Sequence, residues 1–279
     1  MAEFVLNHEG KPKAFAVADA AEFAVAIWQR AKLSAVASVI VYVHGRDMKP
    51  LMLGNDGEPK SSFKEGIVAE LEAAGTVVAM VHWPHHVPIA TPHFMPIQNA
   101  LDAGSSISTL ITALAIKKPN DLPIPVVLVT HSMGSIVLQS AAQGSPAAGW
   151  SSLTQVVIAA AASDIASSRA WIEKLGVRTY VMMNSDDGTL QSASNGGPFL
   201  GLQRGQEFPA AEIADNAVYF DISDLHVGHR YFVKAGSHGN AADLDVLATR
   251  IFKPAYRGSA LNLSTFAQID AVGKIFKLA

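Results

Sequence analysis

Residues 126–142 constrain the fold of this chain more than any other stretch. Residues 126–129 are Val-Val-Leu-Val, an apolar run rich in β-branched side chains, which is the pattern of a strand buried on both faces of a parallel sheet. A short polar link follows, and residues 135–142 have the spacing of small and apolar side chains that is typical of a helix. The stretch therefore predicts a buried strand that turns directly into a helix.

Ser132 lies at the corner between this strand and helix, in the sequence Thr130-His131-Ser132-Met133-Gly134. A serine at a tight strand-to-helix turn forms a nucleophile elbow, which projects its hydroxyl above the carboxyl end of the sheet. The usual pattern is Gly-x-Ser-x-Gly. Thr130 stands in place of the first glycine, whereas Gly134 keeps the second, where helix and strand pack closely. The pattern predicts a nucleophilic Ser132, and the alternative is an ordinary corner whose serine only caps the helix.

Composition limits the class of protein further. The chain has 279 residues, 49% hydrophobic and 16% charged, which is enough to bury a large core in one α/β domain or a domain with a small appendage. The net charge of −3 gives no reason to expect a nucleic-acid partner or binding to an anionic membrane surface. The lack of cysteine excludes disulfides, thiolate catalysis and cysteine-ligated metal sites.

The N-terminal residues do not resemble a signal peptide. Residues 1–13 carry charges and a Gly-Lys-Pro turn but no apolar core, and no apolar stretch of the chain approaches the length of a membrane span. We therefore expect a cytoplasmic protein without stable membrane insertion.

Strand patterns and helix patterns alternate along the chain. After a hairpin at residues 3–17, strands are expected at residues 36–43, 76–82, 126–131, 155–161, 177–184 and 217–222, and helices at residues 19–33, 62–74, 98–116, 135–142, 165–175 and 240–251. This alternation predicts an α/β fold, a mostly parallel sheet with helices on both faces.

The last residues follow this pattern less clearly. We expect one domain over residues 1–253 and a C-terminal appendage over residues 254–279. Within the appendage, Phe266, Ile269, Val272 and Ile275–Phe276 have helical spacing.

The order of the motifs along the chain resembles that of a known superfamily. Their order resembles the α/β-hydrolase superfamily of serine hydrolases, and more narrowly a bacterial group of α/β hydrolases of unknown function. Members of that group share a Trp-Pro after the fourth strand, a His-Ser-Met-Gly elbow, an acid in Asp-x-Ala-Leu and a terminal Gly-His-x-Tyr-Phe. Here these motifs are residues 83–84, 131–134, 187–190 and 228–232. The resemblance runs from about residue 36 to residue 251, and it departs at Thr130, at Thr189 in place of alanine, and in the C-terminal residues.

The resemblance implies a role for each residue of a catalytic triad. The superfamily order of serine, acid and histidine matches Ser132, Asp187 and His229. A serine hydroxyl needs an adjacent base to remove its proton, a histidine can supply that base, and a buried carboxylate orients the histidine. The amide of Met133 opens the helix after the elbow, and the resemblance adds the amide of Arg46 as a second donor to the oxyanion.

Both the acid and the base have alternatives. Asp186 and Asp187 follow the strand at residues 177–184, and Asp164 follows the preceding strand; Asp187 is preferred. Beyond the strand at residues 217–222, His226 comes too soon for a loop to arch back over the elbow, and His238 rivals His229 by position. We prefer His229 because Gly228 permits a turn and two aromatic residues follow to pack the loop down.

A loop rich in histidine and proline follows the strand at residues 76–82. The histidines at the end of this strand and in the loop suggest a metal site, but three prolines stand between the first and the last of them and no fixed ligand geometry is evident, so we expect no metal and no cofactor. We expect instead that its apolar residues form an acyl pocket, with residues 188–209, around Phe199 and Leu200, as the opposite wall. The histidines are His82, His85, His86 and His93, and the apolar residues are Val87, Ile89, Phe94 and Met95.

These features predict a serine hydrolase that cleaves a small-molecule ester or lipid substrate through an acyl-enzyme. The alternatives are a lipase, a thioesterase or another acyl transfer on the same triad, and a catalytically silent binding module with this fold. The chain is also compatible with a homo-oligomer.

Overall fold

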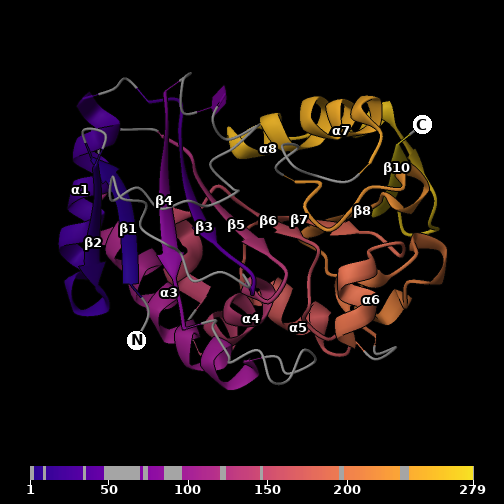
Figure 1. Cartoon of the computed structure of the whole chain (residues 1–279), viewed down its shortest axis with the longest axis horizontal. Helices are drawn as coiled ribbons and strands as arrows, with labels where there is room; N and C mark the ends of the chain where they lie inside the picture. Colours follow the sequence, from indigo (N-terminus) through magenta and orange to yellow (C-terminus); the bar gives the residue numbers. More distant parts are fainter. Residues whose placement is uncertain are drawn as a thin grey trace.

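The computed structural model describes residues 3–8, 11–33, 36–46, 70–71, 75–84, 96–119, 124–144, 147–194, 198–232 and 239–278. Its centre is a sheet of ten strands in the order β2-β1-β4-β3-β5-β6-β7-β8-β10-β9 (Figure 1). The most buried large side chains, among them Trp150, Trp171 and Tyr231, belong to the core between this sheet and its helices.

Six of the predicted strands form the parallel centre of the sheet. All residues of β3, β5 and β6 are buried apart from His131, as expected for strands covered on both faces. Neighbouring strands are in parallel register, with Val43 opposite Thr130 on one side of β5 and His131 opposite Ala159 on the other. These strands are β3 (Ser38–Val43), β4 (Thr76–His82), β5 (Val126–His131), β6 (Gln155–Ala159), β7 (Arg178–Met183) and β8 (Ala217–Asp221).

The predicted N-terminal hairpin is confirmed. Strands β1 (Glu3–His8) and β2 (Lys11–Ala16) pair with each other in antiparallel register. β1 also pairs antiparallel with β4, so the hairpin extends one end of the parallel sheet.

The helical spacing noted in the last residues led to a wrong expectation. These residues form strands β9 (Phe266–Gln268) and β10 (Ile275–Leu278), and β10 pairs with β8 in parallel register. The reason lies in the turn: Asp270 Oδ1 accepts hydrogen bonds from the amides of Lys274 (3.0 Å) and Ile275 (2.8 Å), and Gly273 adopts a left-handed φ of 76°. The strands β9 and β10 thus extend the same sheet, while the division of the chain at residue 253 stays a prediction.

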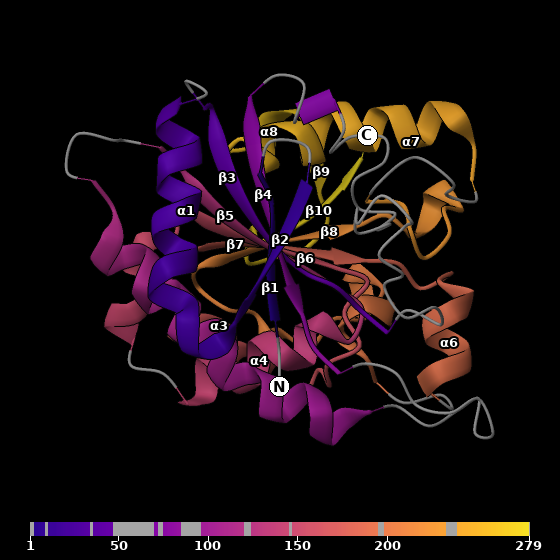
Figure 2. The ribbon, with the colours of Figure 1, turned by 60° about the vertical axis from the view of Figure 1, so that its left-hand side comes forward.

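Helices cover both faces of the sheet, which confirms the predicted α/β architecture (Figures 1 and 2). On one face α1 (Ala20–Leu33) packs on α3 (Ile97–Lys117), and α3 packs on α4 (Gly134–Gly144), which is followed by α5 (Ser168–Lys174). On the other face lie α7 (Ala241–Leu247) and α8 (Lys253–Tyr256), joined by a π-helical turn at Ala248–Phe252, so the closing helix runs beyond its predicted end.

The remaining helical segments are short. α6 (Gly188–Ser194) follows β7 and lies at the carboxyl ends of the parallel strands. The 3₁₀ turns are Val17–Asp19, Ala147–Ser152, Leu200–Leu202, Gly205–Glu207, Ala210–Glu212, Ser223–Leu225 and Leu263–Thr265.

Two predicted segments fall largely outside the described residues. They are the helix at residues 62–74, of which only Glu70 and Leu71 are described, and the loop at residues 85–95. Within the described part of the chain, no helix has the length and apolar character required to cross a membrane.

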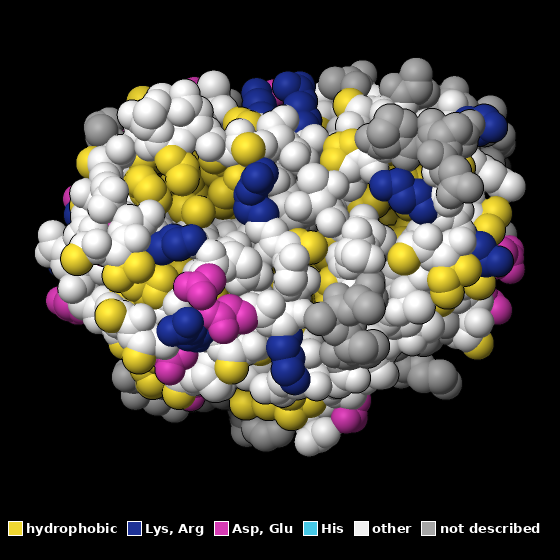
Figure 3. All heavy atoms as spheres, turned by 180° about the vertical axis from the view of Figure 1, so that it is seen from behind, with side chains coloured by type: hydrophobic (Ala, Val, Ile, Leu, Met, Phe, Trp, Pro, Cys, Tyr) yellow, Lys and Arg dark blue, Asp and Glu magenta, His cyan; other side chains and the backbone are white. Residues whose placement is uncertain are grey.

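Figure 3 shows the molecule from behind, where hydrophobic patches alternate with lysine, arginine and acidic side chains. No described histidine side chain is visible on this face.

Candidate active site

The turn between β5 and α4 is as tight as the sequence predicts. β5 ends at His131, Ser132 has a left-handed φ of 52°, and α4 begins at Gly134. A positive φ is strained for a residue with a side chain and persists only where its surroundings hold it. Here the Ser132 amide donates to the Ala159 carbonyl (3.0 Å), and the Ser132 carbonyl accepts from the Ser135 amide (3.0 Å), the Ser135 hydroxyl (2.7 Å) and the Ala162 amide (3.2 Å). The backbone of Ser132 is thus fixed by β6 and by the first turn of α4.

Close backbone approaches explain the glycines around the elbow. A Cβ atom on Gly134 would lie 2.4 Å from the Val43 carbonyl oxygen, and one on Gly45 would lie 2.6 Å from Ser132 Cβ. Thr130, where the usual motif has glycine, is fully buried, and its hydroxyl has no hydrogen-bond partner among the described residues. The end of β3 therefore packs directly on the turn that holds Ser132.

Asp187 and His229 meet at the carboxyl ends of β7 and β8. His229 Nδ1 lies 2.7 Å from Asp187 Oδ2, and the Asp187 side chain is completely buried. Asp187 Oδ1 accepts hydrogen bonds from the amides of Thr189 (3.1 Å) and Leu190 (3.0 Å) at the start of α6. Because a carboxylate only accepts, Nδ1 of His229 carries the proton of this bond, which leaves Nε2 as the basic nitrogen.

The alternative acids and bases lie elsewhere. Asp186 pairs with His226 Nδ1 at 3.1 Å, and the His226 side chain is 81% exposed against 13% for His229. Asp164 is exposed, and its Oδ1 accepts from the Ala166 amide at 2.9 Å. His238 lies outside the described residues. Of the described candidates, only Asp187 and His229 are paired beside Ser132.

Two buried residues hold this arrangement: Asn184, for which the sequence predicted no role, and Tyr231, which was expected to pack the histidine loop down. Asn184 donates from Nδ2 to the Val227 carbonyl (2.7 Å) and accepts at Oδ1 from the Asp186 amide (3.1 Å), so it ties the acid loop to the histidine loop. Tyr231 accepts from the Ala160 amide at 2.7 Å. Burial, and next the charge of Asp187, raise the pKa of Tyr231 well above its usual range, so its hydroxyl stays protonated.

The prediction that Tyr231 and Phe232 pack the histidine loop down is confirmed, since both are almost completely buried. The sequence did not predict the role of Asn184, because an asparagine at the end of a strand belongs to no recognisable motif that would indicate hydrogen bonds to two loops.

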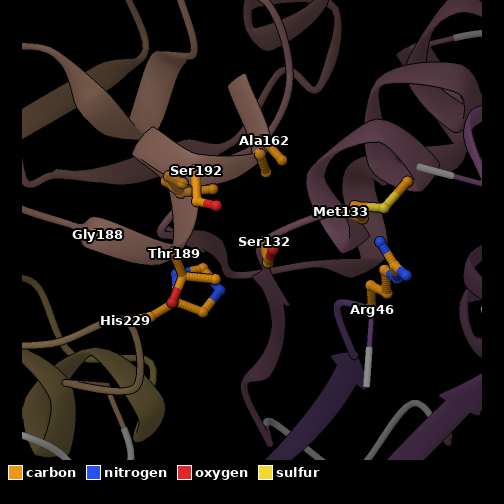
Figure 4. A pocket seen from close by; sticks show the side chains of 10 residues that line it. Arg46, Ser132, Met133, Ala162, Gly188, Thr189, Ser192 and His229 are labelled. Carbon is orange, nitrogen blue, oxygen red and sulfur yellow. The ribbon is translucent and has the colours of Figure 1, made fainter. Parts of the chain in front are cut away.

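A cavity of about 430 Å³ opens at the elbow. Figure 4 shows Ser132 at its centre, His229 and Thr189 on one side, and Met133 and Arg46 on the other. Among the described residues, the Met133 amide has no hydrogen-bond partner, as an oxyanion donor requires. The lining residues are Arg46, Ser132, Met133, Ala162, Gly188, Thr189, Leu190, Ser192, Ala193 and His229.

The predicted walls of this cavity are found in part. α6 at the start of residues 188–209 lines it, whereas Leu200 is fully buried in the core and Phe199 packs against that core. Phe199 and Leu200 do not form the predicted wall because their segment is bonded to the residues after β6. The amides of Leu200 and Gly201 donate to the carbonyls of Ser163 and Ala161, respectively. The predicted apolar residues Val87, Ile89, Phe94 and Met95 lie outside the described residues.

No group of three or more histidine, aspartate or glutamate side chains positioned to hold a metal ion occurs in the part of the chain that the structure describes. His82 is described, and its ring centroid lies 5.0 Å from that of His44. His85, His86 and His93 are outside the described residues.

Comparison with known proteins gives no match to a family model and no match to a curated protein. Among solved structures, the chain is similar to a cutinase of Trichoderma reesei in complex with a phosphonate inhibitor (16% identity, TM-score 0.28), covering 52% of this chain and 65% of that one. It is also similar to a thermophilic esterase of Thermogutta terrifontis (13%, TM-score 0.34, covering 77% and 82%). A third is the peroxisomal α/β-hydrolase Lpx1 of Saccharomyces cerevisiae (12%, TM-score 0.39, covering 87% and 84%).

The chain spans just under two thirds of the cutinase, and the TM-scores are low, so the assignment of the fold depends on the topology itself. The parallel order β4-β3-β5-β6-β7-β8, with the elbow after β5, is that of an α/β-hydrolase fold.

Proposed function

We propose that the protein is a serine hydrolase that cleaves carboxylic esters through an acyl-enzyme. Ser132 is the nucleophile, His229 the general base and Asp187 the acid that orients it. One observation carries the proposal: a serine with a left-handed backbone and a histidine bonded to a fully buried carboxylate line the same cavity. An ordinary strand-to-helix corner needs neither the strained serine nor the buried His–Asp pair.

The first half-reaction forms the acyl-enzyme. Ser132 Oγ attacks the ester carbonyl carbon while His229 Nε2 takes the hydroxyl proton. Asp187, 2.7 Å from Nδ1, stabilises the resulting imidazolium. The tetrahedral intermediate then collapses: the C–O bond to the alcohol breaks, and the alcohol leaves with the proton from Nε2.

The negative oxygen of the tetrahedral intermediate needs donors in fixed positions. The Met133 amide at the N-terminus of α4 is one, and the Arg46 amide after β3 is the second, held near the elbow by the close approach of Gly45 to Ser132. Losing one donor of this kind costs about a hundredfold or more in rate.

The second half-reaction returns the enzyme to its starting state. A water molecule gives its proton to His229 Nε2 and attacks the acyl carbon, the bond to Ser132 Oγ breaks, and Ser132 regains the proton. The products are one carboxylic acid and one alcohol for each ester and water consumed. None of these steps requires a cofactor.

The lining of the cavity favours a short or medium acyl chain. Apolar side chains from Met133, Ala162, Leu190 and Ala193 surround Ser132, and the volume of about 430 Å³ is at the small end for ligand sites.

The test combines an ester panel with an active-site probe. The wild-type protein should hydrolyse p-nitrophenyl esters of short or medium acyl chains and react with a fluorophosphonate at Ser132. Ser132→Ala should lose both properties and keep its melting temperature. Ser105→Ala is the matched control, because Ser105 is exposed on α3 and its hydroxyl donates to the Asp102 carbonyl.

Two results would contradict the proposal. Undiminished hydrolysis by Ser132→Ala would remove Ser132 from the mechanism. A wild-type protein that neither hydrolyses any ester nor reacts with the probe would be a silent binding module.

A further inference from the structure

We propose that His131, the residue before the nucleophile, is a positioning residue that holds His229 in register with Ser132. The inference rests on the proposed function of the site. It starts from one contact: His131 Nε2 lies 3.2 Å from the backbone carbonyl oxygen of His229, which is 98 residues further along the chain.

This contact fixes the protonation of His131. A carbonyl oxygen only accepts hydrogen bonds, so Nε2 of His131 donates and carries a proton. The bond joins the last residue of β5, which is anchored in the centre of the sheet, to the loop that carries the base. Asp187 orients the ring of His229 through Nδ1, whereas His131 holds its backbone, so the two contacts control different degrees of freedom.

The ring of His131 is itself wedged in place. It stacks on Phe232, with centroids 4.3 Å apart and planes 30° apart, and its centroid lies 4.5 Å from that of His229. On another side it lies against Gly45, where an added Cβ atom would be 3.2 Å from His131 Nδ1. His131 therefore separates the loop that carries the base from the loop that carries Arg46.

His131 does not compete with His229 as a base. Although part of the residue remains accessible to solvent, burial of its ring lowers the pKa of His131 well below its usual value, and the nearby charges of His229, Arg230 and His44 lower it further. The hydrogen bond that His131 Nε2 donates to the His229 carbonyl opposes this shift, but the net direction is downward. A neutral His131 does not repel the imidazolium that His229 becomes during the reaction.

Two substitutions that differ by one methylene group test the hydrogen bond. Glutamine places an amide N–H near the position of the imidazole Nε2, so His131→Gln can keep the bond to the His229 carbonyl. Asparagine is too short, so His131→Asn loses it. Both variants remain polar and remove the stacked ring equally, and their melting temperatures are measured first to compare folding.

We expect His131→Asn to lower kcat by about tenfold to a hundredfold with KM within a factor of about two, since small displacements of a catalytic group cost rates of this size. His131→Gln should recover most of the lost kcat. His226→Asn is the control, since His226 is exposed and pairs with Asp186; its kcat should match the wild type.

A spectroscopic readout separates positioning from a general loss of structure. The proton between His229 Nδ1 and Asp187 should give a strongly downfield NMR signal in the wild type and in His131→Gln. In His131→Asn the signal should broaden or disappear, because a displaced His229 exchanges this proton faster with water. Equal kcat losses in both variants, or a wild-type kcat and NMR signal in His131→Asn, would overturn the proposal.

Failure of this inference can be told apart from failure of the proposed function. If wild-type protein does not react with the fluorophosphonate probe, the proposed serine chemistry fails. If wild type reacts and His131→Asn reacts at the same rate, only the positioning role of His131 fails.

Discussion

Replacing Asp187 by asparagine is the most direct test of the acid. Asp187 Oδ1 accepts from the amides of Thr189 and Leu190, and Oδ2 accepts from His229 Nδ1. Asparagine has almost the same shape as aspartate, but its side chain ends in one oxygen, which accepts hydrogen bonds, and one nitrogen, which donates them. The substitution therefore leaves the cavity and the packing in place and changes only the direction of one hydrogen bond.

The surrounding donors decide which way the asparagine points. If its nitrogen faced the amides of Thr189 and Leu190, one partly buried and one buried N–H group would lose their acceptor, at a cost of about 1–3 kcal/mol for the buried one. The oxygen therefore stays on that side, and the nitrogen faces His229. A donor there can bond only to an unprotonated Nδ1, so the proton of the neutral ring moves to Nε2, which then cannot accept the proton of Ser132.

The expected loss is large. The same change of tautomer in a serine protease triad lowers kcat by about ten-thousandfold, which corresponds to about 5 kcal/mol of transition-state stabilisation. We expect a loss of this order in kcat for p-nitrophenyl esters, with KM changed little. The melting temperature should fall by only a few degrees, because the oxygen facing α6 is kept.

Asp186→Asn is the matched control in the neighbouring residue. Asp186 pairs with the exposed His226 and with Arg204 at 3.9 Å, and pairs of this kind contribute little. Its kcat should stay within about a factor of two of the wild type. The reasoning is refuted if Asp187→Asn keeps more than a tenth of the wild-type kcat, or if the large loss occurs in Asp186→Asn instead.

The site and its surroundings lead to three further expected outcomes. His229→Ala should lower kcat by several orders of magnitude with little change in KM, whereas His238→Ala should not, because Asp187 is bonded to His229; the reverse result in steady-state kinetics would move the base to His238. Gly134→Ala should destabilise the fold by about 1–3 kcal/mol, because the new Cβ atom would lie 2.4 Å from the Val43 carbonyl oxygen. Calorimetry should show this as a lower Tm, and an unchanged Tm would argue against the close approach. Ester hydrolysis should survive prolonged treatment with EDTA, since serine acyl transfer needs no metal; activity lost and then restored by zinc would reveal a metal site.

The elbow and the parallel strands were predictable because local patterns decide them. A run of β-branched residues such as 126–129 can be buried on both faces only inside a sheet, and the turn after it leaves few positions for Ser132. For the strands β3 to β8 and the helices α1, α3 and α4, the predicted bounds lie within two residues of those in the structure for the same reason.

The pairing of the acid with the base could be narrowed from sequence but not decided. Asp187 and His229 are 42 residues apart, and their loops are joined by Asn184 and by the packing of Tyr231. The pattern of the chain alone did not separate Asp187 from Asp186. The C-terminal strands were missed for a related reason: the hairpin depends on the turn at Asp270, whereas the apolar spacing suggested a helix.

The two sides of the cavity differ in how freely they can change during evolution. On one side, the carbonyl of Ser132 accepts three hydrogen bonds, so substitutions that shift the elbow would disturb β6 as well. On the other side, the Asp187 side chain accepts hydrogen bonds from backbone amides of α6, which any residue at those positions can donate. The side chains of Thr189 and Ser192 are exposed along the cavity. Under the proposed function, random libraries at residues 189, 192 and 193 should therefore alter acyl preference while Ser132, Asp187 and His229 stay where they are, so α6 is the segment to vary when selectivity is redesigned.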